Sequence, residues 1–326
     1  MAGSLTMSTK TEGVSMLDPV LTEYLLTTAS AGRQPLRLGS PQEGRAMLEL
    51  RAQSAPPGRP IRRVEDVVIP GGDGGIPARV YHDTADPIGT LLFFHGGGWV
   101  IGSVNTYDRL MRELAATSRA RVISVDYRLA PEHAFPAAHD DARSALAWVA
   151  TAYPDSPIGV AGDSAGGNLA AYCAAVDRDS GAGRVVLQAL AYPVLDSDTT
   201  RPSYAETYEV TPLLSGADME WVWDQYVPDV AERTRAEVTP LRLATHAGLP
   251  ATFLVIADHD PLRDEGLLYA EALKEAGVPV AVSRHPDMVH GFAGLLGIIP
   301  QAQRAIDDIG SWSRARFESS NASSLT

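Results

Sequence analysis

The chain has 326 residues, a formal net charge of −13 at pH 7 and 45% hydrophobic residues. This length allows one large domain or two ordinary ones. Nucleic-acid binding needs a basic surface, so the acidic balance argues against a nucleic-acid partner. Cys173 is the only cysteine, which excludes an intramolecular disulfide and a cysteine-rich metal site.

The ends of the chain carry no targeting signal that we recognise. Residues 1–15 lack the basic start and apolar core of a signal peptide. No apolar run approaches the ~18 residues that a membrane helix needs. We therefore expect a cytoplasmic protein without stable membrane association, and flexible termini over residues 1–15 and 319–326.

Short apolar runs rich in β-branched residues alternate with helical patterns along most of the chain. Strands are predicted over residues 67–69, 78–81, 91–94, 122–125, 158–161, 185–192, 253–257 and 280–283, and helices over 107–117, 137–152, 264–276 and 302–317. The alternation predicts an α/β fold in which a mostly parallel, eight-stranded sheet is covered by helices on both faces.

Two segments interrupt this alternation. Residues 16–55 contain helical stretches before the first strand, and residues 196–235 form an aromatic-rich stretch between two strands. They are either helices on the outside of the domain or a helical cap over a ligand site. We expect the cap, because ligands bind at the carboxyl edge of such sheets and the second segment leaves from that edge. Residues 56–195 and 236–318 are predicted to form the main domain.

The pentapeptide Gly162-Asp163-Ser164-Ala165-Gly166 follows a predicted strand and precedes a helical pattern. This is the strand–turn–helix context of a G-x-S-x-G nucleophile elbow. Side chains at the two glycine positions would clash in so sharp a turn. The turn exposes the serine hydroxyl above a helix N-terminus, whose dipole stabilises developing negative charge. Ser164 is therefore the predicted nucleophile.

A serine nucleophile needs a histidine base, which follows it in the chain of folds with this elbow. Among the later histidines, His290 lies beyond the last predicted strand and precedes a glycine and an aromatic residue. His285 lies nearer the end of that strand and fits a structural role. His259 directly precedes the candidate acid and cannot easily face the serine as well. We predict that His290 is the base.

The base in turn needs an orienting carboxylate. Asp260 lies in the loop after a predicted strand and is our candidate. Asp258 fits a turn at the strand end, whereas Asp264 and Glu265 fit first-turn acids of the next helix.

The sequence His95-Gly96-Gly97-Gly98-Trp99 directly follows a predicted buried strand. Three glycines free the backbone to aim several N–H groups at one point, which in acyl transfer is the oxyanion of the tetrahedral intermediate. The N–H of Ala165 is a further donor. A flexible loop and a phosphate cradle are the alternatives, but the usual phosphate-binding glycine patterns are missing. We expect His95 to fix this loop, with Gly96 and Asp163 supporting the site.

A zinc hydrolase is the rival for a chain rich in histidine and aspartate. No H-E-x-x-H pattern occurs, and His133 and His139, six residues apart, are the pair that we weighed as possible metal ligands. We therefore expect no metal and no other cofactor.

Five motifs together resemble the bacterial hormone-sensitive-lipase-like esterases, family IV of the lipolytic enzymes. They run in family order and occupy residues 95–99, 126–133, 162–168, 260–265 and 290–292. The resemblance implies an α/β-hydrolase fold with a helical cap. It implies ester hydrolysis on short to medium acyl chains without a cofactor, and in many members a homodimer through the edge strand.

The resemblance also implies residue roles. Ser164, Asp260 and His290 would form the triad, and Gly97, Gly98 and Ala165 would donate to the oxyanion. The motif at residues 126–133 has no catalytic role that follows from its residues. We expect its Arg128, Glu132 and His133 to brace the loops around the site. In many relatives a tyrosine precedes the catalytic aspartate, whereas here that residue is His259.

The predicted function is therefore hydrolysis of a small-molecule carboxylic ester by acyl transfer. We expect the rate to fall as the histidine base becomes protonated. An amidase or lactonase with the same triad is one alternative. A non-catalytic small-molecule receptor on the same fold is another. A membrane-docked lipase is the third, supported only by the short apolar stretch at residues 293–299.

Overall fold

The computed structural model of the chain describes residues 16–32, 34–72, 74–207 and 213–323. Its centre is an eight-stranded sheet in the order β1-β2-β4-β3-β5-β6-β7-β8. The strands are β1 (Arg63–Ile69), β2 (Ile76–His82), β3 (Thr90–Phe94), β4 (Arg121–Val125), β5 (Ile158–Asp163), β6 (Val185–Ala191), β7 (Ala251–His259) and β8 (Val280–Val289).

Nine α-helices lie within the described residues. They are α1 (Pro19–Ser30), α2 (Pro41–Ser54), α3 (Asp108–Ser118), α4 (Ala137–Ala152), α5 (Ala165–Ser180), α6 (Pro202–Thr207), α7 (Gly216–Tyr226), α8 (Arg263–Glu275) and α9 (Pro300–Ser323). Short 3-10 turns occur at η1 (Leu36–Leu38), η2 (Glu232–Thr234), η3 (Pro240–Arg242) and η4 (Phe292–Gly294). No helix in these ranges is both long and apolar enough to cross a bilayer.

The sheet is mostly parallel, as predicted. Strand β2 pairs antiparallel with β1 and β4, and every other neighbouring pair is parallel. The carboxyl ends of β5, β7 and β8 therefore lie along one edge, since parallel strands end on the same side. Loops that leave this edge carry the candidate catalytic residues.

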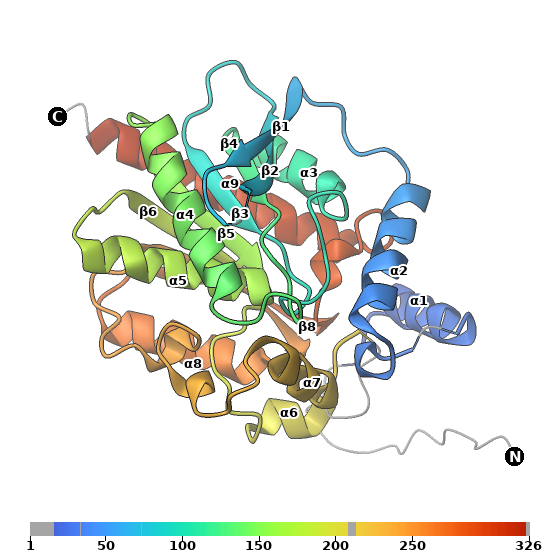
Figure 1. The fold of residues 1–326 in the computed structure, drawn as a ribbon. Helices are drawn as coiled ribbons and strands as arrows, with labels where there is room; N and C mark the ends of the chain where they lie inside the picture. Colours follow the sequence, from blue (N-terminus) through green and yellow to red (C-terminus); the bar gives the residue numbers. More distant parts are fainter. Residues whose placement is uncertain (1–15, 33, 73, 208–212, 324–326) are drawn as a thin grey trace, which may run out of the picture.

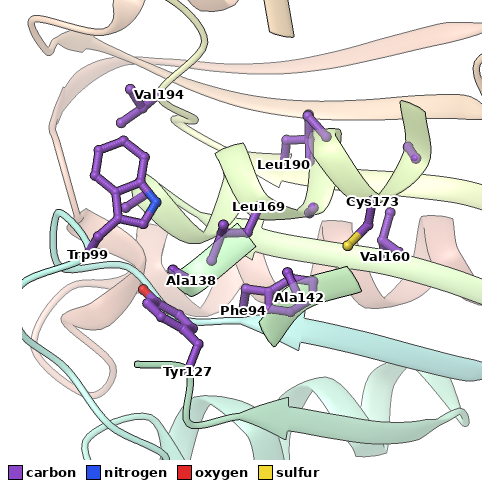
Figure 2. Packing of buried hydrophobic residues seen from close by; sticks show 14 of the residues in the cluster. Phe94, Trp99, Tyr127, Ala138, Ala142, Val160, Leu169, Cys173, Leu190 and Val194 are labelled. Carbon is purple, nitrogen blue, oxygen red and sulfur yellow. The ribbon is translucent and has the colours of Figure 1, made fainter. Parts of the chain in front are cut away.

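Helices cover both faces of the sheet because neighbouring strand residues point to opposite sides. In β3, Leu92 and Phe94 pack into a cluster with α4, α5 and α8, whereas Leu91 and Phe93 pack with α1, α3 and α9. Figure 1 shows α4 and α5 in front of the sheet and α9 behind it. Figure 2 shows part of the first cluster, where Leu169 and Cys173 of α5 lie near the strands.

The segments that interrupt the β–α alternation form α1, α2, α6 and α7. In Figure 1, α6 and α7 lie at the bottom of the view and α1 and α2 at its right. The two segments meet where the backbone N–H of Arg37 donates to the Asp218 carboxylate, at 3.1 Å. Capping boxes begin α2 at Ser40 and α7 at Ser215.

The predicted flexible tail from residue 319 is wrong for its first five residues. Helix α9 continues to Ser323, beyond the predicted end at residue 317. Phe317 is fully buried, and the side chain of Asn321 donates to the carbonyl of Ile88 at 2.9 Å. These contacts tie the last turns to the domain. Residues 1–15 and 324–326 lie outside the described residues.

Candidate active site

Ser164 occupies the sharp turn between β5 and α5. Its backbone has φ 54° and ψ −123°, a conformation that non-glycine residues seldom adopt. Its N–H donates to the carbonyl of Ala191 at 2.9 Å, which fixes the turn to β6. A Cβ added to Gly162 would lie 2.2 Å from the carbonyl oxygen of Gly166, and one added to Gly166 would lie 2.0 Å from that of Phe94. Only glycine fits at either position.

The predicted nucleophile, base and acid lie in one hydrogen-bonded chain. The Oγ of Ser164 is 2.9 Å from Nε2 of His290, and Nδ1 of His290 is 2.8 Å from Oδ2 of Asp260. The loop after β7 supplies Asp260 and the loop after β8 supplies His290. All three side chains are buried, and Asp260 also accepts the N–H of Leu262. A carboxylate at this position favours the tautomer with the proton on Nδ1, and in that tautomer Nε2 can accept a proton from the serine.

The glycine loop after β3 has an unusual backbone. Gly97, Gly98 and Trp99 have φ values of 114°, 62° and 58°, so three successive residues are left-handed. The carbonyl of Gly97 accepts the N–H groups of Val100 and Ile101, both at 3.0 Å. Successive N–H groups in such a turn form an anion-binding concavity.

A further backbone donor lies at the start of α5. Ala165 is the first residue of that helix, and the N–H groups of the first turn have no partner within a helix. This N–H therefore belongs to the positive end of the helix dipole, beside the Ser164 hydroxyl.

Asp163 joins the elbow to the glycine loop. Its Oδ1 accepts the N–H of Gly96 at 2.8 Å, and its Oδ2 accepts the hydroxyl of Tyr107 at 2.9 Å. Burial raises the pKa of Asp163 to about 6, although these bonds favour its charged form. His95, the residue before Gly96, is fully buried and stacks on Tyr127 with the ring centres 4.3 Å apart.

Comparison with known proteins agrees with this arrangement. Residues 91–294 match the family described as alpha/beta hydrolase fold. The chain belongs to the alpha/beta hydrolase family. It is 40% identical over 276 residues to the carboxylesterase NlhH of Mycobacterium tuberculosis, covering 80% of this chain and 85% of that protein. It is 38% identical over 301 residues to the esterase LipI of the same organism, covering 89% and 92%.

Solved structures give the same result. A hyperthermophilic esterase from the archaeon Pyrobaculum calidifontis superposes with a TM-score of 0.86 at 37% identity, covering 92% of this chain and 99% of that one. The predicted fold and the resemblance to hormone-sensitive-lipase-like esterases are thus confirmed. The chain is an alpha/beta hydrolase that acts on carboxylic esters.

The rival residues Asp258, Asp264 and His285 contact other residues of this hydrolase. Asp258 pairs with Arg284 at 2.6 Å. Asp264 accepts a backbone N–H from Ser203 in α6 at 2.9 Å. His285 contacts a serine of its own strand through Nε2. Each has a structural partner of its own.

Sequence reasoning missed the contacts of two residues of the hydrolase, the half-buried Tyr107 and the fully buried Glu265. The sequence predicts only a helix start at Tyr107, yet its hydroxyl donates to the carboxylate of Asp163. Glu265 lies in the first turn of α8, as we expected, but its carboxylate does not cap that helix. It is fully buried and accepts the N–H groups of Leu195 and Asp196, and burial raises its pKa well above the usual range. Its place in the motif at residues 260–265 was the only signal available.

Two other features of the hydrolase bear on ligands. A surface cavity of about 350 Å³ lies between α4, α5 and the chain after α7, and the triad residues are not part of its lining. Within the described residues, no group of three histidine, cysteine, aspartate or glutamate side chains is arranged to hold a metal ion.

Proposed function

We propose that this esterase is a serine carboxylesterase with Ser164 as nucleophile, His290 as base and Asp260 as the orienting acid. The observation that carries the proposal is the continuous chain of hydrogen bonds of 2.9 and 2.8 Å from the serine to the carboxylate. We further propose that its substrates are small esters with short to medium acyl chains.

The reaction then follows from the positions of these groups. His290 accepts the proton of the Ser164 hydroxyl as the serine oxygen attacks the ester carbonyl. The N–H groups of Gly97, Gly98 and Ala165 stabilise the resulting oxyanion. His290 returns the proton to the leaving alcohol. Water then attacks the acyl-enzyme by the same route and releases the acid.

Helices α1, α2, α6 and α7 are proposed to form the cap, over a catalytic domain of residues 56–195 and 236–318. The contact between Arg37 and Asp218, which joins the two cap segments, supports this division. The low exposure of the Ser164 residue, at 6%, fits a site that is covered.

Assembly and location are also proposals. The edge position of β8 in the sheet supports a homodimer through that strand. A cytoplasmic location rests on the sequence alone. Gel filtration with light scattering tests the first, and fractionation of the source cells tests the second.

The test of the proposed function is hydrolysis of p-nitrophenyl esters from acetate to laurate. Wild type, Ser164→Ala and the matched control Ser180→Ala, at the exposed far end of α5, are compared. We expect activity that peaks at short chains in wild type and control and is lost in Ser164→Ala. Normal hydrolysis by Ser164→Ala would overturn the mechanism. Faster cleavage of p-nitroanilides or lactones than of esters would favour the amidase or lactonase alternative.

A further inference from the structure

We propose that Arg45, in the N-terminal helix α2, is a positioning residue for the oxyanion hole. It holds the glycine loop in the conformation that directs the N–H groups of Gly97 and Gly98 toward the substrate oxygen. This inference rests on the proposed function of that loop, and Arg45 itself touches no reacting atom.

The loop needs support from outside because its own backbone is strained. Trp99 is left-handed, which disfavours a residue with a bulky side chain. Its side chain is fully buried and stacks on Tyr226 of α7, with the ring centres 4.4 Å apart and the planes at 13°. Figure 2 shows Trp99 at the end of the buried cluster, on the side of Val194. Packing thus fixes the Trp99 side chain, whereas the carbonyl of the next residue, Val100, needs a hydrogen-bond donor from elsewhere.

Arg45 supplies this donor and also binds a second loop. Its Nε donates to the carbonyl of Val100 at 2.8 Å, and its Nη2 donates to that of Ala130 at 2.7 Å. Both Nη atoms also bind the carboxylate of Glu132, at 2.9 and 2.7 Å. The bidentate pair with Glu132 therefore fixes the guanidinium while it donates hydrogen bonds to two loops. The Arg45 hydrogen bonds lower the pKa of Glu132 to about 2, so this carboxylate is charged at neutral pH.

The second loop that Arg45 binds, through the carbonyl of Ala130, contains the motif at residues 126–133, for which the sequence indicated no catalytic role. The N–H of Ala130 donates to the carbonyl of Trp99 at 2.8 Å, and that of Phe135 donates to the carbonyl of Tyr226, also at 2.8 Å. This loop thus connects the glycine loop to α7. Glu132 serves by fixing Arg45, which gives the bracing that we expected of it a specific partner.

The consequence is catalytic because Val100 is only two residues from Gly98. The N–H of Val100 already donates to Gly97, so Val100 cannot shift without moving the glycine carbonyl and its neighbours. An oxyanion-hole donor works only within about 2.7–3.1 Å of the developing oxyanion. Release of the Val100 carbonyl would therefore weaken transition-state binding more than substrate binding.

The test compares Arg45→Met, Arg45→Lys and the control Arg51→Met. Arg51 lies on the same helix, and its recorded contact is with the ring of Tyr24. Each variant is assayed with an ester and with the matching thionoester, whose sulfur accepts hydrogen bonds poorly. We expect Arg45→Met to lower kcat for the ester ~10- to 100-fold with little change in KM, less than the ~100- to 1,000-fold loss that removal of one oxyanion donor causes, because the donors stay present but are less well placed.

The thionoester separates positioning from a general structural role. Arg45→Met should lower kcat for the thionoester less than threefold, so that the ester-to-thionoester ratio falls. Arg45→Lys, which keeps the charge but not the fork, should fall between wild type and Arg45→Met. Arg51→Met should match wild type on both substrates. Equal losses on both substrates, or no loss in Arg45→Met, would overturn the inference.

Two controls keep the outcomes distinct. If Arg45→Met does not fold, as judged by circular dichroism, the ratio measured with Arg45→Lys decides by the same criterion. Full ester hydrolysis by Ser164→Ala would refute the proposed function itself. An active wild type that depends on Ser164, with an unchanged ratio in the Arg45 variants, would refute only the role of Arg45.

Discussion

The nucleophile elbow and the glycine loop both hold non-glycine residues in a left-handed backbone, but by different means. At the elbow, the conformation of Ser164 is enforced by backbone atoms of the sheet, which leave no room beside Gly162 and Gly166. In the glycine loop, the conformation of Trp99 depends on distant side chains, since Tyr226 packs on its ring and Arg45 binds the next carbonyl.

The two halves of the site differ in which contacts fix their backbone conformation. The elbow is part of the folding core, so damage to it should destabilise the whole domain. The glycine loop is held by contacts from α2 and α7, so damage there should lower the rate and leave the fold intact. We therefore propose that α2 and α7 support the oxyanion hole as well as forming part of the cap.

The largest effect is expected for Gly166→Ala. Its Cβ would lie 2.0 Å from the carbonyl oxygen of Phe94 and 2.5 Å from that of His95, and backbone atoms cannot yield as a flexible side chain does. We expect the free energy of unfolding to fall by more than ~4 kcal/mol. Urea unfolding measures this, with Gly294→Ala as the control because its Cβ meets nothing within 4 Å. A stable Gly166→Ala protein would contradict the comparison.

Gly97→Ala should impair the glycine loop and lower kcat, with much less effect on stability. Its Cβ would lie 2.1 Å from the carbonyl oxygen of Ile101, at a φ of 114° that side chains rarely adopt. The loop must rearrange, so kcat should fall at least ~100-fold, as for loss of one oxyanion donor. Steady-state kinetics beside a urea curve checks that the rate falls much more than the stability. A normal kcat would show that this loop has another task.

Asp163→Asn tests the bridge between the two halves through pH. Burial raises the pKa of Asp163 to about 6 from 3.8, so the folded protein binds a proton more readily than the unfolded chain. The Asp163 contribution to stability is therefore full below pH 3.8 and is lost as the pH rises through 6. As the pH rises from 4 to 7.5, the free energy of unfolding of Asp163→Asn should therefore increase relative to that of wild type.

The size of this change has an upper bound. A pKa difference of about 2 at ~1.36 kcal/mol per unit gives ~3 kcal/mol in the free energy of unfolding. Urea unfolding of both proteins at the two pH values measures the change. A difference between the variants that is independent of pH would mean that Asp163 does not titrate in this range.

The smallest effect is expected at Tyr226. Tyr226→Phe keeps the ring on Trp99 but removes the hydroxyl that lies 2.6 Å from Nδ1 of His139. Loss of a buried partner should cost about 1–3 kcal/mol of stability, with kcat nearly unchanged. Tyr226→Leu also removes the stacking on Trp99 and should lower kcat severalfold. Equal kcat values for the two variants would show that the stacking of Tyr226 on Trp99 does not support the glycine loop.

Sequence patterns predicted the residues whose constraints are local. The glycines around Ser164, the glycines after β3 and the strand ends before Asp260 and His290 leave short, recognisable spacings. The same holds for the alternation of strands and helices. These features follow from sterics within a few residues.

The supporting residues could not be predicted in this way. Arg45 meets Glu132 across 87 residues, and Tyr107 meets Asp163 across 56. Glu132 and Asp163 lie in motifs that we expected to support the site, but no periodicity or motif indicates Arg45 or Tyr107 as their partners. The end of α9 was missed for the same reason, because the acceptor of Asn321 lies 233 residues away at Ile88.

The most direct test of the central claim is covalent labelling with diethyl p-nitrophenyl phosphate, followed by intact-protein mass measurement and peptide mapping. The account predicts a single diethylphosphoryl group on Ser164, with esterase activity lost in proportion to labelling. It also predicts no labelling of a folded Ser164→Ala protein. A label on another residue, or undiminished hydrolysis by fully labelled protein, would contradict Ser164 as the nucleophile.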